Sequence, residues 1–128
     1  MNVRDRKRIM ATINGWKPML GLTDWVITLS DEDPAIEGRI AETNCRRDLR
    51  VAQIAVRHDA VNVPALENLC ILHELLHLTP NFYEWDDQLE ANALLEQTQR
   101  HMLETLLDDV ARWILVAAGN EFPVPSVA

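Results

Sequence analysis

Two histidines and a glutamate stand at a spacing that suits metal chemistry: His73, Glu74 and His77 form the pattern HExxH. Residues four apart lie on one face of a helix, so both imidazoles can reach the same ion. Glu74 follows His73 and lies at the flank of that face, where it can take a proton from water without binding the metal. Because imidazole ligands with an open coordination position are typical of catalytic zinc, we expect Zn²⁺ at this site.

A catalytic zinc site of this kind needs a third protein ligand. The remaining histidines, His58 and His101, do not continue the motif, so a carboxylate is expected. We favour Glu90, because it falls one turn into a long helix that is predicted after the motif and that can fold back over the HExxH helix. The alternatives left open are Glu84, Asp86, Asp87 and Glu96.

Tyr83 lies in the predicted loop after the motif, where its hydroxyl can donate a hydrogen bond to the oxyanion of a tetrahedral intermediate. The alternative is a packing role for its ring. For the motif itself, the alternative is two core histidines with an incidental glutamate. Burying three ionisable groups in an apolar helix without a partner is costly, and a metal ion removes that cost.

The elements that must position these residues follow from hydrophobic spacing. Apolar residues at helical intervals predict an amphipathic helix over residues 3–20. Three segments then have the β-branched or alternating pattern of strands: Trp25–Leu29, Gly38–Cys45 and Leu49–Val56. Their short connections favour an antiparallel meander. The strand at Gly38–Cys45 is expected at the sheet edge nearest the cleft, where an extended peptide can add to it.

The second half of the chain is predicted to be helical. The HExxH helix runs from Asn62, a good N-cap, to Leu78, and Pro80 stops it. A loop to about Trp85 is followed by one long helix from Asp86 to about Ala118. The expected fold is therefore α+β: an N-terminal helix, a small three-stranded, mostly antiparallel sheet, a buried HExxH helix and a long C-terminal helix packed over it. We expect a single domain over residues 1–118 and a tail over 119–128.

Composition narrows the class of protein. The chain has 128 residues, with 12 basic and 20 acidic side chains and a net charge of −8, so nucleic acid is not an expected partner. No apolar run approaches the roughly 20 residues that span a bilayer, and the charged N-terminus does not resemble a secretory signal. Two cysteines, Cys45 and Cys70, do not make a disulfide framework. These features predict a cytoplasmic protein without a membrane partner, and they leave its oligomeric state open.

The segment ILHELLHL, followed by LEANALLEQ, is similar to the HExxH…E zinc peptidases called gluzincins. It resembles most the small ImmA/IrrE-type and phage-encoded metallopeptidase domains, over residues 20–105. The resemblance implies a helix, a short three-stranded sheet, the HExxH helix and a second helix with a glutamate ligand. Glu90, Ala91 and Asn92 match the EAN pattern of that second helix, so the resemblance also implies Glu90 as the ligand, and a phage or prophage source.

The motif and the resemblance together predict a zinc-dependent hydrolase, most directly a peptidase that acts on a peptide or protein substrate with Glu74 as general base. One alternative is a non-catalytic, zinc-containing binding or regulatory domain that acts through a protein partner. A buried fourth protein ligand would favour that alternative. A nuclease-type zinc hydrolase is disfavoured by the missing third histidine and by the acidic charge balance.

Overall fold

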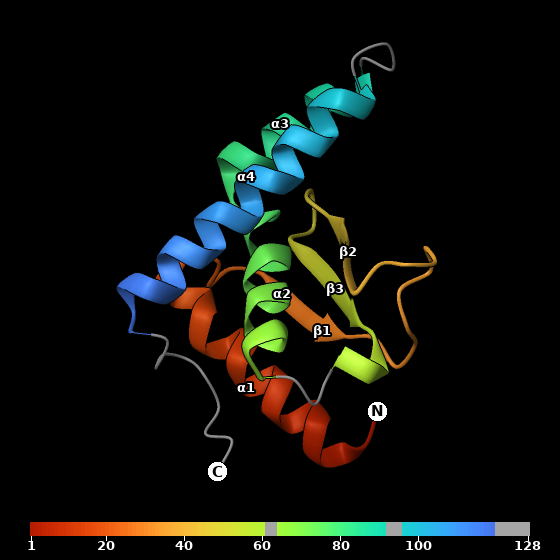
Figure 1. Ribbon diagram of the computed structural model, residues 1–128, viewed down its shortest axis with the longest axis vertical. Helices are drawn as coiled ribbons and strands as arrows, with labels where there is room; N and C mark the ends of the chain where they lie inside the picture. The colour runs from red at the N-terminus through yellow and green to blue at the C-terminus, as the bar shows by residue number, and fades with distance from the viewer. Residues whose placement is uncertain (61–63, 92–95, 120–128) are drawn as a thin grey trace.

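The computed structural model describes residues 1–60, 64–91 and 96–119, and within these ranges it contains four α-helices and a three-stranded mixed sheet (Figure 1). The N-terminal helix α1 spans Val3–Met19, as the apolar spacing predicts. The Asn2 side chain caps it by accepting a hydrogen bond from the backbone N–H of Asp5 (2.8 Å). Pro18 lies within its last turn. The predicted α+β class is therefore confirmed.

The sheet differs from the predicted meander. Its strands are β1 (Val26–Leu29), β2 (Ala41–Arg46) and β3 (Val51–Val56), in the spatial order β1-β3-β2. β2 and β3 form the expected antiparallel pair, but β1 runs parallel to β3. The predicted meander, in which each strand pairs with the next one along the chain, was wrong: one of the two pairings is parallel, and β3 takes the central position. Its sequence VAQIAV has no charged residue and is the most buried strand, whereas the polar strand AETNCR lies at an edge.

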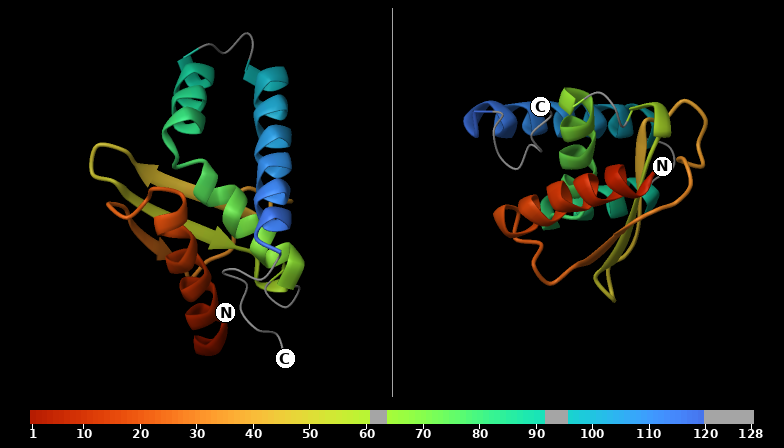
Figure 2. Two further views of the ribbon diagram at one scale, coloured as in Figure 1. Left: turned by 90° about the vertical axis from the view of Figure 1, so that its left-hand side faces the viewer. Right: turned by 90° about the horizontal axis from the view of Figure 1, so that it is seen from below.

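The helices cover one face of this sheet (Figure 2). The HExxH segment belongs to α2, which spans Pro64–Leu76 and packs against α1, α4 and the edge strand β2. The core lies between these layers. Its fully buried apolar members come from α1, β3, α2 and α4 and from the connection that follows α1: Ile9, Ile13, Trp16, Leu22, Ile54, Val56, Ile71, Leu72, Leu75, Leu103, Leu107 and Ala111.

The long helix predicted from Asp86 to Ala118 is two helices instead. α3 spans Pro80–Ala91 and α4 spans Glu96–Ala117, and they pack side by side in opposite directions (Figure 2). The loop predicted between Pro80 and Trp85 is also helical. Pro80 stops α2 but opens α3, because its fixed φ suits the first helical position, and the Thr79 carbonyl accepts the first helical hydrogen bond from the N–H of Tyr83 (2.9 Å).

Two further expectations fall outside the described residues. The N-cap predicted at Asn62 lies in the segment 61–63, and the tail predicted over 119–128 is described only at Gly119, which follows α4 with a positive φ of 69°. Within the described parts of the chain, the helices are each too short or too polar to cross a membrane.

Candidate metal centre

The HExxH residues come together at the C-terminal end of α2. His73 and Glu74 lie in its last turn, and His77 follows directly on its last residue, Leu76. The turn tightens there, because the N–H groups of Leu78 and Thr79 bond to carbonyls only three residues back. The two imidazole rings still share one face, with centroids 5.2 Å apart. His73 is 9% exposed and Glu74 is 7% exposed, so both are largely withdrawn from solvent.

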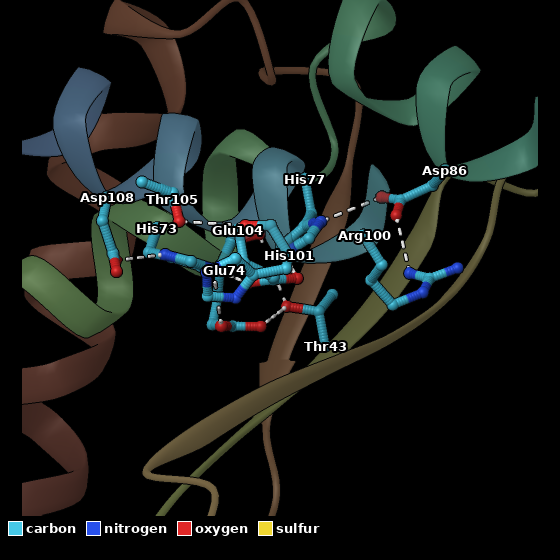
Figure 3. Close-up of polar contacts among 10 residues, drawn as sticks. All are labelled: Thr43, His73, Glu74, His77, Asp86, Arg100, His101, Glu104, Thr105 and Asp108. Atoms are coloured by element: carbon cyan, nitrogen blue, oxygen red, sulfur yellow. Dashed lines mark hydrogen bonds and ion pairs between the residues drawn. The ribbon is translucent and has the colours of Figure 1, made fainter. Parts of the chain in front are cut away.

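Glu104 of α4 completes a three-residue cluster with these histidines (Figure 3). One carboxylate oxygen, Oε2, lies 2.6 Å from Nε2 of His73, and the other, Oε1, lies 3.3 Å from Nε2 of His77. One ligand atom from each of the three residues lies within 4.8 Å of the other two. Two imidazole nitrogens and one carboxylate oxygen therefore converge on a single point between α2 and α4.

Further carboxylates hold the opposite edge of each imidazole. Nδ1 of His73 lies 2.6 Å from Oδ1 of Asp108, and Nδ1 of His77 lies 2.9 Å from Oδ2 of Asp86. Arg100 donates to the other oxygen of Asp86 (3.2 Å). Without an ion, Nε2–H of His73 donates to Glu104. An Nδ1–H that donates to a carboxylate fixes the ring orientation and leaves Nε2 as the nitrogen that can bind a metal ion, which is the arrangement seen around metal-binding histidines.

The electrostatics of the cluster favour positive charge. Burial by itself would lower the pKa of His77, but its hydrogen bonds with Asp86 and Glu104 reverse this effect and raise the pKa to about 10. The pKa of His73 is raised in the same way, against burial, by Glu104, Glu74 and Asp108. Burial would raise the pKa of Glu104, yet the two histidines hold it well below its usual value. Four carboxylates surround two imidazoles, and this excess of negative charge suits a cation.

Glu74 lies beside the cluster without belonging to it. Its Oε2 is 3.9 Å from Nε2 of His73, and its Oε1 accepts a hydrogen bond from the hydroxyl of Thr43 in β2 (2.9 Å). Burial raises the pKa of Glu74, and the charges of His77 and His73 oppose that shift. A carboxylate with a raised pKa, held in place by one hydrogen bond, is suited to accept and return a proton.

The carboxylates that the sequence offers as the third metal ligand differ in their positions. Asp86 contacts the outer edge of His77, while Glu84 and Asp87 are exposed and lie 3.9 Å and 3.2 Å from Arg47. Glu90 and Glu96 lie in α3 and α4, but their side chains are outside the described residues. Glu90 therefore stays a prediction, and among the described residues Glu104 completes the group that could hold a metal ion.

Tyr83 lies in α3 rather than in a loop, and it lines a cleft together with Glu74, His77 and Glu104. The guanidinium of Arg47 stacks over its ring at 4.7 Å. Burial and the neighbouring thiol of Cys45 raise the pKa of Tyr83 to about 12, which keeps the hydroxyl protonated and able to donate. Its predicted role as an oxyanion donor is compatible with this position and stays a prediction.

Glu104 and Asp108 were not considered from the sequence, although a signal was present. They stand four residues apart and border the stripe Leu103, Leu107 and Ala111, which is the buried face of α4. These two carboxylates lie at the margin of an apolar helical face. Their four-residue spacing is the same as that of His73 and His77 on α2. Two helices that pack along such faces can align the two pairs.

Comparisons with protein-family models, with curated protein sequences and with solved structures gave no match to this chain.

Proposed function

We propose that the protein is a zinc-dependent hydrolase, most directly a peptidase of the gluzincin type, with His73, His77 and Glu104 as metal ligands and Glu74 as general base. The observation that carries the proposal is the convergence of two Nε2 atoms on the Glu104 carboxylate while other carboxylates hold both Nδ1 atoms. Two histidines with one carboxylate form a donor set that catalytic zinc uses in proteins.

The number of ligands favours a catalytic ion over a structural one. Among the described residues, three side chains have ligand atoms close enough together, within 4.8 Å of one another, to share an ion. Structural zinc has four protein ligands instead. A cleft of about 420 Å³ opens onto these three residues and Glu74. A substrate can therefore approach the ligand group, which a closed structural site would prevent.

When held by His73, His77 and Glu104, zinc would supply Lewis acidity, which would polarise a carbonyl and make water acidic enough to lose a proton near neutral pH. The side chains supply the remaining functions. Glu74 accepts the proton of the attacking water and returns it to the leaving amine. Thr43 holds the Glu74 carboxylate in position, and Asp108 and Asp86 keep the imidazoles oriented. Tyr83 donates to the developing oxyanion.

A peptide substrate is supported by the sheet edge beside the cleft. In the described residues β2 is an edge strand that pairs with β3, and its residues Thr43, Asn44 and Cys45 line the cleft that contains Glu74 and His77. An extended peptide can pair with the free backbone groups of such an edge strand. This placement agrees with the expectation for Gly38–Cys45 and would bring a scissile amide alongside Glu74.

The decisive experiment is the zinc content of the purified protein, measured by plasma mass spectrometry. We expect one zinc per chain in the wild type and a large loss in both Glu104→Ala and His77→Ala, because each change removes one of three ligands. Glu90→Ala tests the ligand predicted from the sequence, and it should retain the metal if Glu104 is the third ligand. Zinc lost in Glu90→Ala and kept in Glu104→Ala would instead assign the third ligand to Glu90. A zinc-loaded wild type that hydrolyses no peptide would favour the non-catalytic binding domain.

A second prediction concerns the carboxylate behind His73. We expect Asp108→Asn to weaken Zn²⁺ binding about 10- to 100-fold, as loss of a carboxylate that orients a metal-binding histidine usually does. Competition with a chromogenic zinc chelator measures the affinity. Asp109→Asn removes the same charge one residue along α4 and outside the cluster. Equal affinities in the two variants would show that Asp108 does not orient the ligand.

A further inference from the structure

The cleft that opens onto the cluster has an apolar part next to the site. One wall comes from α2, with Leu66, Leu69 and Cys70, and the facing wall comes from the chain entering β2, with Ile40 and Ala41. His73, Glu74 and Glu104 lie along the same cleft. A peptide bond held beside Glu74 would therefore have a neighbouring apolar side chain covered by these walls, because burial of apolar surface favours that arrangement.

Two arginines, Arg39 and Arg112, line the same cleft from opposite sides, one before β2 and one on α4. Both are exposed, and in the described part of the chain neither guanidinium has a hydrogen bond or ion pair with another side chain. Other arginines around the sheet are paired: Arg46 with Asp48, Arg47 with Asp87, Arg50 with Asp24 and Arg57 with Asp59.

The two arginines stand out against the charge of the whole chain. With a net charge of −8, the protein has an excess of carboxylates that could pair with a surface arginine, yet these two arginines line the cleft without such a partner among the described residues. Arg39 also lines the second cleft, which holds Tyr83 and Asp86, so it lies where the two clefts meet. A guanidinium presents a fork of N–H donors that matches a carboxylate.

We propose that the cleft selects peptides in which an apolar side chain stands next to a carboxylate, with the apolar side chain against Leu66 and Leu69 and the carboxylate bound by Arg39 and Arg112. The carboxylate can belong to an Asp or Glu side chain or to the C-terminus of the peptide. This inference rests on the proposed peptidase function, and it adds the class of substrate. The arginines also attract acidic segments that the rest of this acidic surface repels.

The test measures binding separately from cleavage. Zinc-loaded wild type and Glu74→Gln are titrated with fluorescent blocked peptides in which Leu has Asp, or its isostere Asn, on either side. A second peptide set ends in Leu with a free or an amidated C-terminus. In each pair, the acid peptide has Asp or a free C-terminus, and the amide peptide has Asn or an amidated C-terminus. We compare the dissociation constant of the amide peptide with that of the acid peptide, as a ratio. We expect the acid form to bind about fivefold or more tightly at low salt, and the preference to fall at about 1 M salt, where charges are screened beyond about 3 Å.

The arginine variants identify the groups responsible. We expect Arg39→Gln and Arg112→Gln each to reduce the preference for the acid peptide, and the double variant to abolish it, while zinc content stays at the wild-type value. Arg4→Gln, an exposed arginine of α1, is the matched control and should keep the preference. The Asp and free-terminus sets show which source of carboxylate is bound.

The outcomes separate this inference from the proposed function. Cleavage of both acid and amide peptides at equal rates, with equal affinities, would overturn the selection by arginine and leave the peptidase proposal standing. Arginine-dependent binding of the acid peptide without cleavage by the wild type would support the selection and overturn the peptidase proposal. A preference for acid peptides that survives in the double variant would assign the recognition to other residues and contradict the role of Arg39 and Arg112.

Discussion

Replacing Glu74 with glutamine is expected to leave one zinc per chain and to reduce the rate of peptide hydrolysis about 10²- to 10⁴-fold, the range of a lost general base. The amide of glutamine has the shape of the carboxylate and can keep the hydrogen bond from Thr43, but it cannot accept a proton at neutral pH. Since Glu74 is outside the three-residue ligand group, the metal content should not change.

The experiment compares kcat and KM of wild type and Glu74→Gln at equal zinc content. Glu32→Gln, in the exposed turn after β1, is the control for a change from glutamate to glutamine. Thr43→Val gives an intermediate test, because it keeps the base and removes the hydrogen bond that positions it; we expect a smaller loss, mainly in kcat. A Glu74→Gln variant as fast as the wild type would mean that another group takes the proton.

The sequence was most informative where a short-range rule applies. The four-residue spacing of His73 and His77 requires only local helical geometry, and the structure places both rings on one face. The helix α1 and the strand segments follow from periodicities of the same kind. The order of the strands depends instead on which strand is buried on both sides. The sequence predicts that β3 is partly covered on both faces, but the short connections favour a meander. In the structure β3 lies between β1 and β2 and pairs in parallel with β1.

The third ligand shows a larger limit of local reasoning. Asp86 and Glu104 both contact His77, at 2.9 Å and 3.3 Å, although they are 18 positions apart in the sequence. On one continuous helix they would be about 27 Å apart, at about 1.5 Å per residue. A continuous helix from Asp86 leads naturally to a ligand near its start, such as Glu90. Because α3 and α4 pack in opposite directions, the chain returns and places Glu104 at the site.

A buried ion pair fixes the other end of the site helix. Glu67, in the first turn of α2, is 2% exposed and accepts two hydrogen bonds from Arg8 of α1, from Nε at 3.1 Å and from a terminal nitrogen at 2.9 Å. Asp5 binds the other terminal nitrogen of Arg8 (2.7 Å). The hydrogen bonding of its guanidinium to Glu67 is the main reason that the pKa of Arg8 lies above its usual value. α2 is therefore held by Glu67 at its start and by the contacts of His73 and His77 with Glu104 at its end.

Arg8→Met is expected to lower the free energy of unfolding by about 3 kcal/mol, at the lower end of the ~3–5 kcal/mol found when one partner of a buried pair is removed. The lower end applies because the Arg8 side chain is 24% exposed, so water can partly hydrate the carboxylate left behind. Methionine matches arginine in helix propensity. Urea unfolding at fixed zinc content measures the change, and Arg46→Met, which breaks an exposed pair with Asp48, should cost no more than about 1 kcal/mol.

A double variant distinguishes the contribution of the ion pair to stability from the cost of leaving one buried charge without its partner. In Arg8→Met/Glu67→Leu both charges are removed, so we expect most of the lost stability to return, since apolar replacement of a whole buried pair is often neutral. If Arg8→Met alone lowers the free energy of unfolding no more than Arg46→Met does, then Glu67 finds another partner or takes up a proton. If the double variant regains stability but binds zinc more weakly than wild type, the pair contributes mainly by fixing the position of α2, and with it the alignment of His73 and His77 against Glu104.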